Sequence, residues 1–368
     1  MFERQWFSCS SQLGLQPKWL ELEDLLLTRQ AQKCLKSIDR YFQDCPRSEH
    51  VFFSRQRQRV LHLCRRQPAR NVSIFFHSFW SGFNYYKSIF PYILRDALNY
   101  LGDASLVIEI VDNPHACDIS IGSCFPPDQP NIKLSLLHST SVLYLGENVR
   151  PNYGDYDYSF STDLNTYAGR NSYLPVTLSS LYDCAETEHL IEPASVSNRL
   201  SQLYTTFSES HLPWSSRDQA VVFVGNNYEP KRTWLLSMLG KLGIRCSQYG
   251  SHSRPIHSKH DLYGKHRFIM CPENSFGHGY ITEKFLHGIM SGGKLLHWGY
   301  VPDRLRSLAG DRIISVNDDN LYSVFTNISM AHPPSSSLPD VLDLFSTMSE
   351  NQYVSCVKHM SKIISLYM

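Results

Sequence analysis

The sequence predicts an α/β protein made of two Rossmann-like domains, preceded by a helical extension. Two observations lead to this fold class. From residue 71 onward, short apolar runs of strand type alternate with segments of helical periodicity, and the alternation occurs once on each side of a polar stretch at residues 208–218. Strands that alternate with helices form parallel sheets covered by helices on both faces. The length of 368 residues also suits two or three domains.

The first 70 residues differ from the rest in their pattern. Apolar side chains recur at helical spacing through residues 18–43, and a basic run follows up to Arg66. Pro68 marks a linker before the first strand. We therefore expect residues 1–70 to form a helical N-terminal extension.

The next part of the chain predicts the first Rossmann-like domain, at residues 71–207. Expected strands lie at residues 71–79, 105–111, 117–123 and 141–148. A helix is expected at residues 85–102, interrupted by Pro91.

The second Rossmann-like domain is expected at residues 219–330, followed by a helical tail at 331–368. Strands are predicted at residues 220–226, 267–274, 294–299 and 312–316, and helices at residues 231–243, 282–293 and 319–329. In such sheets a ligand binds beyond the carboxyl ends of the strands.

Composition excludes several classes of protein. Lysine and arginine total 35 against 34 acidic residues, and a net charge of +1 gives no electrostatic basis for binding nucleic acid. None of the ten cysteines forms a C-x-x-C pair, which argues against zinc ribbons and redox dithiols. The N-terminus lacks a signal-peptide pattern, and no apolar run is long enough to span a membrane. We expect reduced thiols and an intracellular protein.

The segment from Cys271 to Lys284 carries the strongest chemical signal. A strand ends near Cys271, a loop with two glycines follows, and Thr282 can cap a helix whose first turn holds Glu283 and Lys284. A helix N-terminus and a lysine suit a phosphate. A capped surface helix is the alternative, and it would be the better interpretation of an isolated T-E-K. The E-N-S triplet, the two glycines and an aromatic residue in the same loop favour a functional site.

Three segments together resemble the α1,3-fucosyltransferase family, family 10 of the glycosyltransferases. These are P-E-N-S-F-G-H-G-Y-I-T-E-K at residues 272–284 with H-W-G at 297–299, F-V-G-N-N-Y-E-P-K-R at 223–232, and L-G-E-N-V-R-P-N-Y at 145–153 with Y-D-Y-S-F at 156–160. The resemblance covers residues 71 to 320. It implies a GT-B fold, with two Rossmann-like domains facing a cleft, and inverting transfer of L-fucose from GDP-β-L-fucose to a glycan hydroxyl.

The resemblance also implies roles for individual residues. Glu147 would be the general base, and Arg232 and Lys284 would neutralise the leaving diphosphate. Glu283 would hold the ribose, and Asn274 and Tyr280 would contact the phosphates. Asn227, in the segment at 223–232, is a further predicted donor contact.

Independently of the resemblance, Gly250 is a candidate donor contact. His77 and Trp80, at the end of an expected strand, are candidate acceptor contacts because aromatic faces suit pyranose rings, and a place in the core is the alternative for such an aromatic residue.

Several alternatives stay open at this point. Asp155 and Asp157 form a D-x-D triplet of the kind that holds a divalent metal in other glycosyltransferases, but they fall where the family has a Y-D-Y strand. We expect no metal and no cofactor, with full activity in EDTA. The two other interpretations of the chain are an enzyme that uses a different GDP-sugar donor and a carbohydrate-binding relative without activity.

The family analogy also bears on the acceptor and the location. It suggests a glycan acceptor, with transfer to the 3-hydroxyl of GlcNAc or glucose. The expected location is the cytoplasm. The weakly basic, amphipathic C-terminal segment leaves room for weak association with the inner face of a membrane, although a helix packed on the core is the expected role of this segment.

Overall fold

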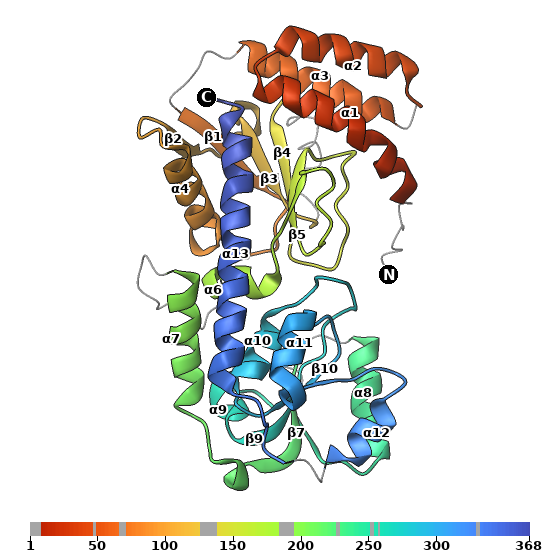
Figure 1. Ribbon diagram of the computed structural model, residues 1–368, viewed down its shortest axis with the longest axis vertical. Helices are drawn as coiled ribbons and strands as arrows, with labels where there is room; N and C mark the ends of the chain where they lie inside the picture. Colours follow the sequence, from red (N-terminus) through yellow and green to blue (C-terminus); the bar gives the residue numbers. More distant parts are fainter. Residues whose placement is uncertain are drawn as a thin grey trace. The chain divides into compact units, whose positions relative to one another are not determined.

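The computed structural model describes residues 9–46, 49–65, 71–125, 138–183, 195–225, 229–250, 254–256, 258–328 and 332–368 (Figure 1). The chain divides into two compact units. Unit 1 comprises Met1–Leu174 and Val354–Met368, and unit 2 comprises Pro175–Tyr353. Each unit contains one parallel sheet. The predicted fold class of two Rossmann-like domains is therefore confirmed.

The sheet of unit 1 has six strands in the order β2-β1-β3-β4-β5-β6, and every neighbouring pair is parallel. Every residue of β3, β4 and β5 is buried, which explains why these strands read as continuous apolar or small-residue runs rather than as alternating ones. The strands are β1 (Asn71–His77), β2 (Val107–Ile110), β3 (Ile119–Gly122), β4 (Thr140–Leu145), β5 (Tyr158–Ser161) and β6 (Asn171–Tyr173).

Helix α4 (Phe90–Leu101) corrects one detail of the sequence prediction. We expected a helix from residue 85 interrupted by Pro91, but the helix begins at Phe90 and Pro91 lies in its first turn. Proline is tolerated there because the amide at that position needs no partner within the helix. A short 3₁₀ turn, Tyr85–Lys87, precedes the helix. The helix ends at Leu101 and is capped by Gly102, whose φ of 71° favours glycine.

Three N-terminal helices also belong to unit 1, α1 (Cys9–Leu27), α2 (Ala31–Asp44) and α3 (His50–Arg65). They lie side by side as a small bundle (Figure 1). Arg55 and Arg59 of α3 bind the carboxylate of Asp157 at 2.8 and 3.0 Å, and Asp157 and Arg59 have no exposed surface. The predicted extension at residues 1–70 is thus joined to the first sheet through buried charges.

The C-terminal helix α13 (Leu338–Ser365) contributes its last part to unit 1. Beyond the helix, the Tyr367 hydroxyl donates to the backbone oxygen of Asp118, and it also contacts the Thr140 hydroxyl at 2.7 Å. His359 is buried against the rings of Tyr158 and Phe160. This end of the helix therefore packs on the core of unit 1.

The sheet of unit 2 has five parallel strands in the order β11-β10-β9-β7-β8. The strands are β7 (Asp218–Val224), β8 (Cys246–Tyr249), β9 (His266–Met270), β10 (Lys294–His297) and β11 (Ile313–Ser315). The connecting helices are α8 (Pro230–Lys241), α9 (Lys259–Tyr263), α10 (Glu283–Met290), α11 (Asp303–Ala309) and α12 (Leu321–Thr326).

Unit 2 begins earlier in the chain than the predicted second domain. Helices α6 (Val176–Asp183) and α7 (Val196–Ser208) fall in unit 2, although we placed residues up to 207 in the first domain. The Thr177 amide donates to the backbone oxygen of Ile281 at 3.2 Å, and the ring of Phe207 lies 5.3 Å from that of His287. These contacts hold both helices on unit 2, and they join residues too far apart in sequence for periodicity to reveal.

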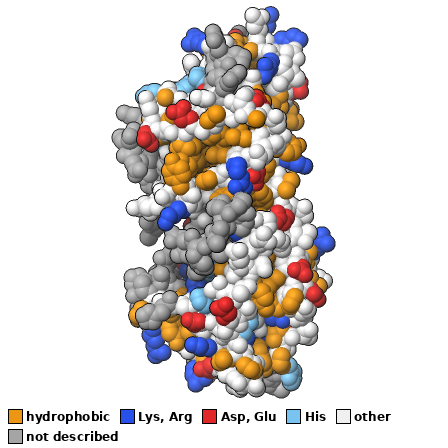
Figure 2. All heavy atoms as spheres, turned by 90° about the vertical axis from the view of Figure 1, so that its left-hand side faces the viewer, with side chains coloured by type: hydrophobic (Ala, Val, Ile, Leu, Met, Phe, Trp, Pro, Cys, Tyr) orange, Lys and Arg blue, Asp and Glu red, His pale blue; other side chains and the backbone are white. Residues whose placement is uncertain are grey.

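On the molecular face shown in Figure 2, side chains of both charge signs are interspersed, and hydrophobic side chains gather in one larger area. Mixed surface charge agrees with the net charge of +1. Within the described ranges, every helix is too short or too polar to cross a lipid bilayer.

Candidate donor site

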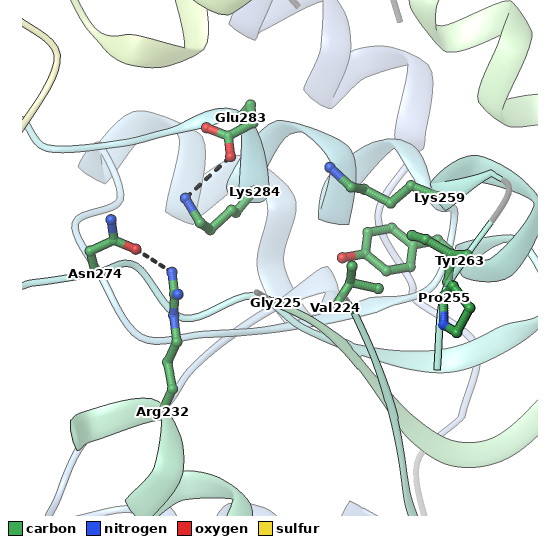
Figure 3. Close-up of a pocket in the computed structure, with 11 residues that line it drawn as sticks. Val224, Gly225, Arg232, Pro255, Lys259, Tyr263, Asn274, Glu283 and Lys284 are labelled. Atoms are coloured by element: carbon green, nitrogen blue, oxygen red, sulfur yellow. Dashed lines mark hydrogen bonds and ion pairs between the residues drawn. The ribbon is translucent and has the colours of Figure 1, made fainter. Parts of the chain in front are cut away.

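A pocket of about 510 Å³ lies at the carboxyl ends of strands β7, β8 and β9 of unit 2. This edge is where open parallel sheets bind ligands, because the loops that follow adjacent strands meet there. Figure 3 shows charged side chains from α8, α9 and α10 around the pocket. The lining residues are Val224, Gly225, Arg232, Gly250, Pro255, Ile256, Lys259, Tyr263, Asn274, Glu283 and Lys284.

Arg232 reaches the pocket from the first turn of α8, which Pro230 begins. Its side chain is 4% exposed, so the guanidinium is held in place by the protein around it. One terminal nitrogen donates to the amide oxygen of Asn274 and lies 3.4 Å from the backbone oxygen of Pro272. Figure 3 shows the Arg232 and Asn274 side chains directed toward one another. These contacts fix the orientation of the planar guanidinium group, whose fork of donors is the kind that suits phosphate oxygens.

The N-terminus of α10 forms the opposite wall of the pocket. Thr282 caps this helix as predicted, since its hydroxyl accepts a hydrogen bond from the Lys284 amide at 3.3 Å. The Lys284 ammonium lies 3.2 Å from both the Thr282 hydroxyl and a carboxylate oxygen of Glu283. The first turn of α10 therefore presents one cation and one anion to the pocket (Figure 3).

A buried carboxyl group, Glu273, lies behind this helix terminus. It has no exposed surface and accepts hydrogen bonds from the Thr282 amide at 2.9 Å and the Thr282 hydroxyl at 2.7 Å. Its carboxylate is 3.9 Å from the Lys284 ammonium. Burial raises the pKa of Glu273 to about 7, although Lys284 and Thr282 act in the opposite direction. Glu273 thus fixes the start of α10 and the position of Lys284.

Lys259 is a third cation in the pocket, and sequence reasoning missed it. It is the first residue of α9, and its ammonium lies 3.3 Å from Nδ1 of the buried His287. Lys259 lies in a polar part of the sequence and was not among the predicted donor residues. The available signal was the position of Lys259 directly after Ser258, which caps α9.

The charges of the pocket favour an anionic ligand. Arg232, Lys259 and Lys284 carry three positive charges. Burial opposes ionisation of Glu283, but Lys284, His287 and Lys259 outweigh it and lower the pKa of this carboxyl group. The lining thus holds three cations and one anion, a balance suited to a diphosphate.

The other predicted donor residues have different positions. Gly250 lines the pocket after β8, with a φ of 146° that favours glycine. Tyr280 is 2% exposed and is not among the residues that line the pocket, so its contact with phosphate stays a prediction. Asn227 lies outside the described residues.

The predicted base and acceptor residues belong to unit 1. Glu147 is half-buried in the loop after β4, and its backbone oxygen accepts a hydrogen bond from the Val149 amide at 2.7 Å. His77 ends β1, and both His77 and Trp80 line a second pocket, of about 640 Å³. The structure therefore brings together five predicted residues at the donor pocket and two at the second pocket.

The D-x-D triplet has a structural explanation. Burial opposes ionisation of Asp157, but Arg55 and Arg59 hold the pKa of this carboxyl group well below its usual range. The second oxygen of Asp157 accepts a hydrogen bond from the Ser141 amide at 2.8 Å. Both carboxylate oxygens of Asp157 are thus occupied by ion pairs and hydrogen bonds inside unit 1. Among the described residues, no group of three or more metal-ligating side chains gathers.

Comparison with known proteins identifies one sequence relative and several structures. No family model matches the chain. It is 22% identical over 231 residues to the α-(1,3)-fucosyltransferase FucT of Helicobacter pylori, and the match covers 57% of this chain and 48% of that protein. The chain thus spans about half the length of this relative.

Comparison with solved structures also finds α1,3-fucosyltransferases. A crystal structure of an α1,3-fucosyltransferase matches with a TM-score of 0.50 and 18% identity over 78% of this chain and 81% of that chain. Its complexes with GDP and with GDP-fucose match with the same TM-score and identity, over 76% of this chain and 91% of theirs. The chain therefore has the GT-B type of fold seen in α1,3-fucosyltransferases of known structure.

Proposed function

We propose that the chain transfers L-fucose from GDP-β-L-fucose to a hydroxyl of a glycan acceptor with inversion. The observation that carries this proposal is the pocket of unit 2, where Arg232 of the segment at 223–232 meets Asn274, Glu283 and Lys284 of the segment at 272–284. These residues occupy the motif positions to which the resemblance assigns GDP binding. The similar solved structure binds GDP-fucose, which supports the same donor here.

The pocket suits the leaving group of such a reaction. When the bond between the sugar and the β-phosphate breaks, negative charge grows on the diphosphate. Arg232 and Lys284 stabilise that charge more than they stabilise the intact donor, so they lower the barrier. Glu283 accepts hydrogen bonds from the ribose hydroxyls, and Asn274 and Tyr280 orient the phosphates.

Glu147 is assigned the role of general base. The acceptor oxygen attacks the anomeric carbon of fucose, the bond from that carbon to the phosphate oxygen breaks, and the acceptor proton moves to the Glu147 carboxylate. The products are the fucosylated glycan and GDP. His77 and Trp80 are proposed to contact the acceptor, and the 3-hydroxyl of GlcNAc or glucose is the proposed target.

The test separates the chemical step from donor binding. We expect Glu147→Gln to lower transfer from GDP-fucose by about 10²-fold or more, with the affinity for GDP unchanged in calorimetry. Glu109→Gln is the matched control, because Glu109 lies exposed on β2 in the same unit and should leave transfer unchanged. Turnover of Glu147→Gln equal to that of the unmodified protein would remove Glu147 from this role.

A further inference from the structure

Glu273 lies directly behind the donor pocket, in the loop after β9. It is not among the residues that line the pocket, and it has no exposed surface. Its amide donates to the backbone oxygen of Trp298 at 2.9 Å, which ties this loop to the end of β10. A side-chain carbon at Gly299 would lie 2.7 Å from Cγ of Glu273, so the glycine leaves the room that this side chain fills. The backbone bond and the close packing thus hold the carboxyl group in place.

Lys284 is the cation that faces this buried carboxyl group, at 3.9 Å. Further titratable groups around it are Glu283, His297 and Cys271. Burial lowers the pKa of His297 to about 4 and raises that of the Cys271 thiol to about 12, so both are neutral at pH 8. The charge on Glu273 is therefore balanced mainly by Lys284.

Lys284 is shared between Glu273 and the pocket. Its ammonium lies 3.2 Å from a carboxylate oxygen of Glu283, and the lysine also lines the pocket (Figure 3). A phosphate bound there would be a third anion around this cation. The side chain of Glu283 is 29% exposed and keeps contact with water, whereas that of Glu273 does not. Of the two carboxylates, Glu273 is therefore the one whose ionised form an arriving phosphate destabilises more.

The hydrogen bonds of Glu273 provide a place for a proton. Its Oε1 atom accepts a hydrogen bond at 2.9 Å from the Thr282 amide, which can only donate. Its Oε2 atom lies 2.7 Å from the Thr282 hydroxyl, which can accept as well as donate. A proton on Oε2 would thus keep both hydrogen bonds, with the second one reversed. Because Oε2 is also the oxygen that faces Lys284, protonation there removes the negative charge that attracts the ammonium.

We propose that Glu273 is a positioning residue that takes up a proton from solvent when the diphosphate binds, and thereby leaves the charge of Lys284 to the donor. This inference rests on the proposed function, because it takes the anion at Lys284 to be the diphosphate of GDP. Ionised Glu273 and the diphosphate compete for one cation. The donor therefore binds more tightly to the form of the protein in which Glu273 is protonated.

Calorimetry of GDP binding measures this proton directly. Burial raises the pKa of Glu273 to about 7, so at pH 8 about nine-tenths of this group is ionised in the empty protein. The terminal phosphate of GDP, with a second pKa of about 6, is already ionised at this pH. If the bound diphosphate raises the pKa of Glu273 by one to two units, about 0.4–0.8 proton is taken up for each GDP bound. Titrations in Tris and in HEPES, which differ in ionisation enthalpy, give this number.

The affinity for GDP should accordingly fall by about three- to tenfold from pH 7 to pH 8.5. Glu273→Gln should bind GDP without proton uptake and without this fall. Asp340→Asn is the matched control, since Asp340 is exposed on α13 in unit 2 and should leave the uptake unchanged. Lys284→Ala tests the same coupling from the other side. Without the ammonium Glu273 is already protonated at pH 8, and the uptake should fall close to zero.

GDP binding to the unmodified protein without proton uptake at pH 8 would overturn this inference and leave the proposed donor standing. Uptake that persists undiminished in Glu273→Gln would overturn it as well, because the proton would then belong to another group. If GDP does not bind at all, the proposed function is contradicted, and this inference with it.

Discussion

Replacing Glu273 with glutamine should change how the stability of the protein depends on pH. Glu273 is wholly buried against the N-terminus of α10, and its pKa in the folded protein is about 7 against an ordinary 4.5. Between these two pH values the folded protein holds a proton on this group that the unfolded chain has released. The free energy of unfolding therefore falls as the pH rises through this interval.

The size of the effect follows from the two pKa values. At 1.36 kcal/mol for each pH unit, the interval from 4.5 to about 7 corresponds to roughly 3 kcal/mol. Glutamine has nearly the same shape but does not titrate. It also leaves one of the two Thr282 donors without its acceptor, but this cost is the same at every pH.

Urea denaturation at pH 5 and pH 8 measures this term. The difference in unfolding free energy between the unmodified protein and Glu273→Gln should shift by about 2–3 kcal/mol between the two conditions, in the direction that favours the variant at pH 8. Glu109→Gln is the control, since Glu109 lies exposed on β2 of unit 1 and takes no part in this cluster. A difference that is the same at both pH values would show that Glu273 is ionised throughout, with Lys284 and the helix terminus outweighing burial.

Three further predictions concern the charged residues. Lys284→Ala should weaken GDP binding by about 10- to 100-fold in calorimetry, because a charge-assisted hydrogen bond to phosphate contributes about 1.5–3 kcal/mol; unchanged affinity would count against the phosphate assignment. Lys259→Ala should weaken GDP binding by roughly three- to tenfold while the exposed Lys265→Ala does not, and equal affinities of these two variants would exclude Lys259 from the site. Asp157→Asn should destabilise the protein by about 3 kcal/mol or more in urea denaturation, because Arg55 and Arg59 would remain buried without their anion, and a smaller loss would mean that water reaches them.

The sequence predicted the parallel sheets because their signal is local. Buried runs such as β4 and the capped start of α10 at Thr282 are each specified by a few adjacent residues. The donor pocket followed from the same logic, since the loops after adjacent parallel strands must meet at one edge of the sheet. The assignment of Arg232 and Lys284 to the same diphosphate came instead from the family resemblance, and both residues line the pocket.

Glu273 and Lys259 show where local patterns were insufficient. Glu273 stands in the E-N-S triplet, but its importance depends on burial and on the position of Thr282 nine residues later, which the sequence does not give. Lys259 lies in a polar stretch that resembles any solvated loop. Only the fold brings it to His287 and to the pocket.

The charges around Asp157 indicate which structural role the N-terminal helices have in unit 1. A carboxylate with no exposed surface is stable only if cations replace the water it has lost, and for Asp157 these cations are Arg55 and Arg59 of α3. The guanidinium of Arg170, which donates to the backbone oxygen of Asp157 at 2.8 Å, packs 4.2 Å from the ring of Trp19 on α1. Deleting the helices would therefore expose part of this cluster and leave Asp157 without its two cations. Residues 9–65 consequently act as part of the core of unit 1, and a shortened protein that begins at the first strand should not fold stably.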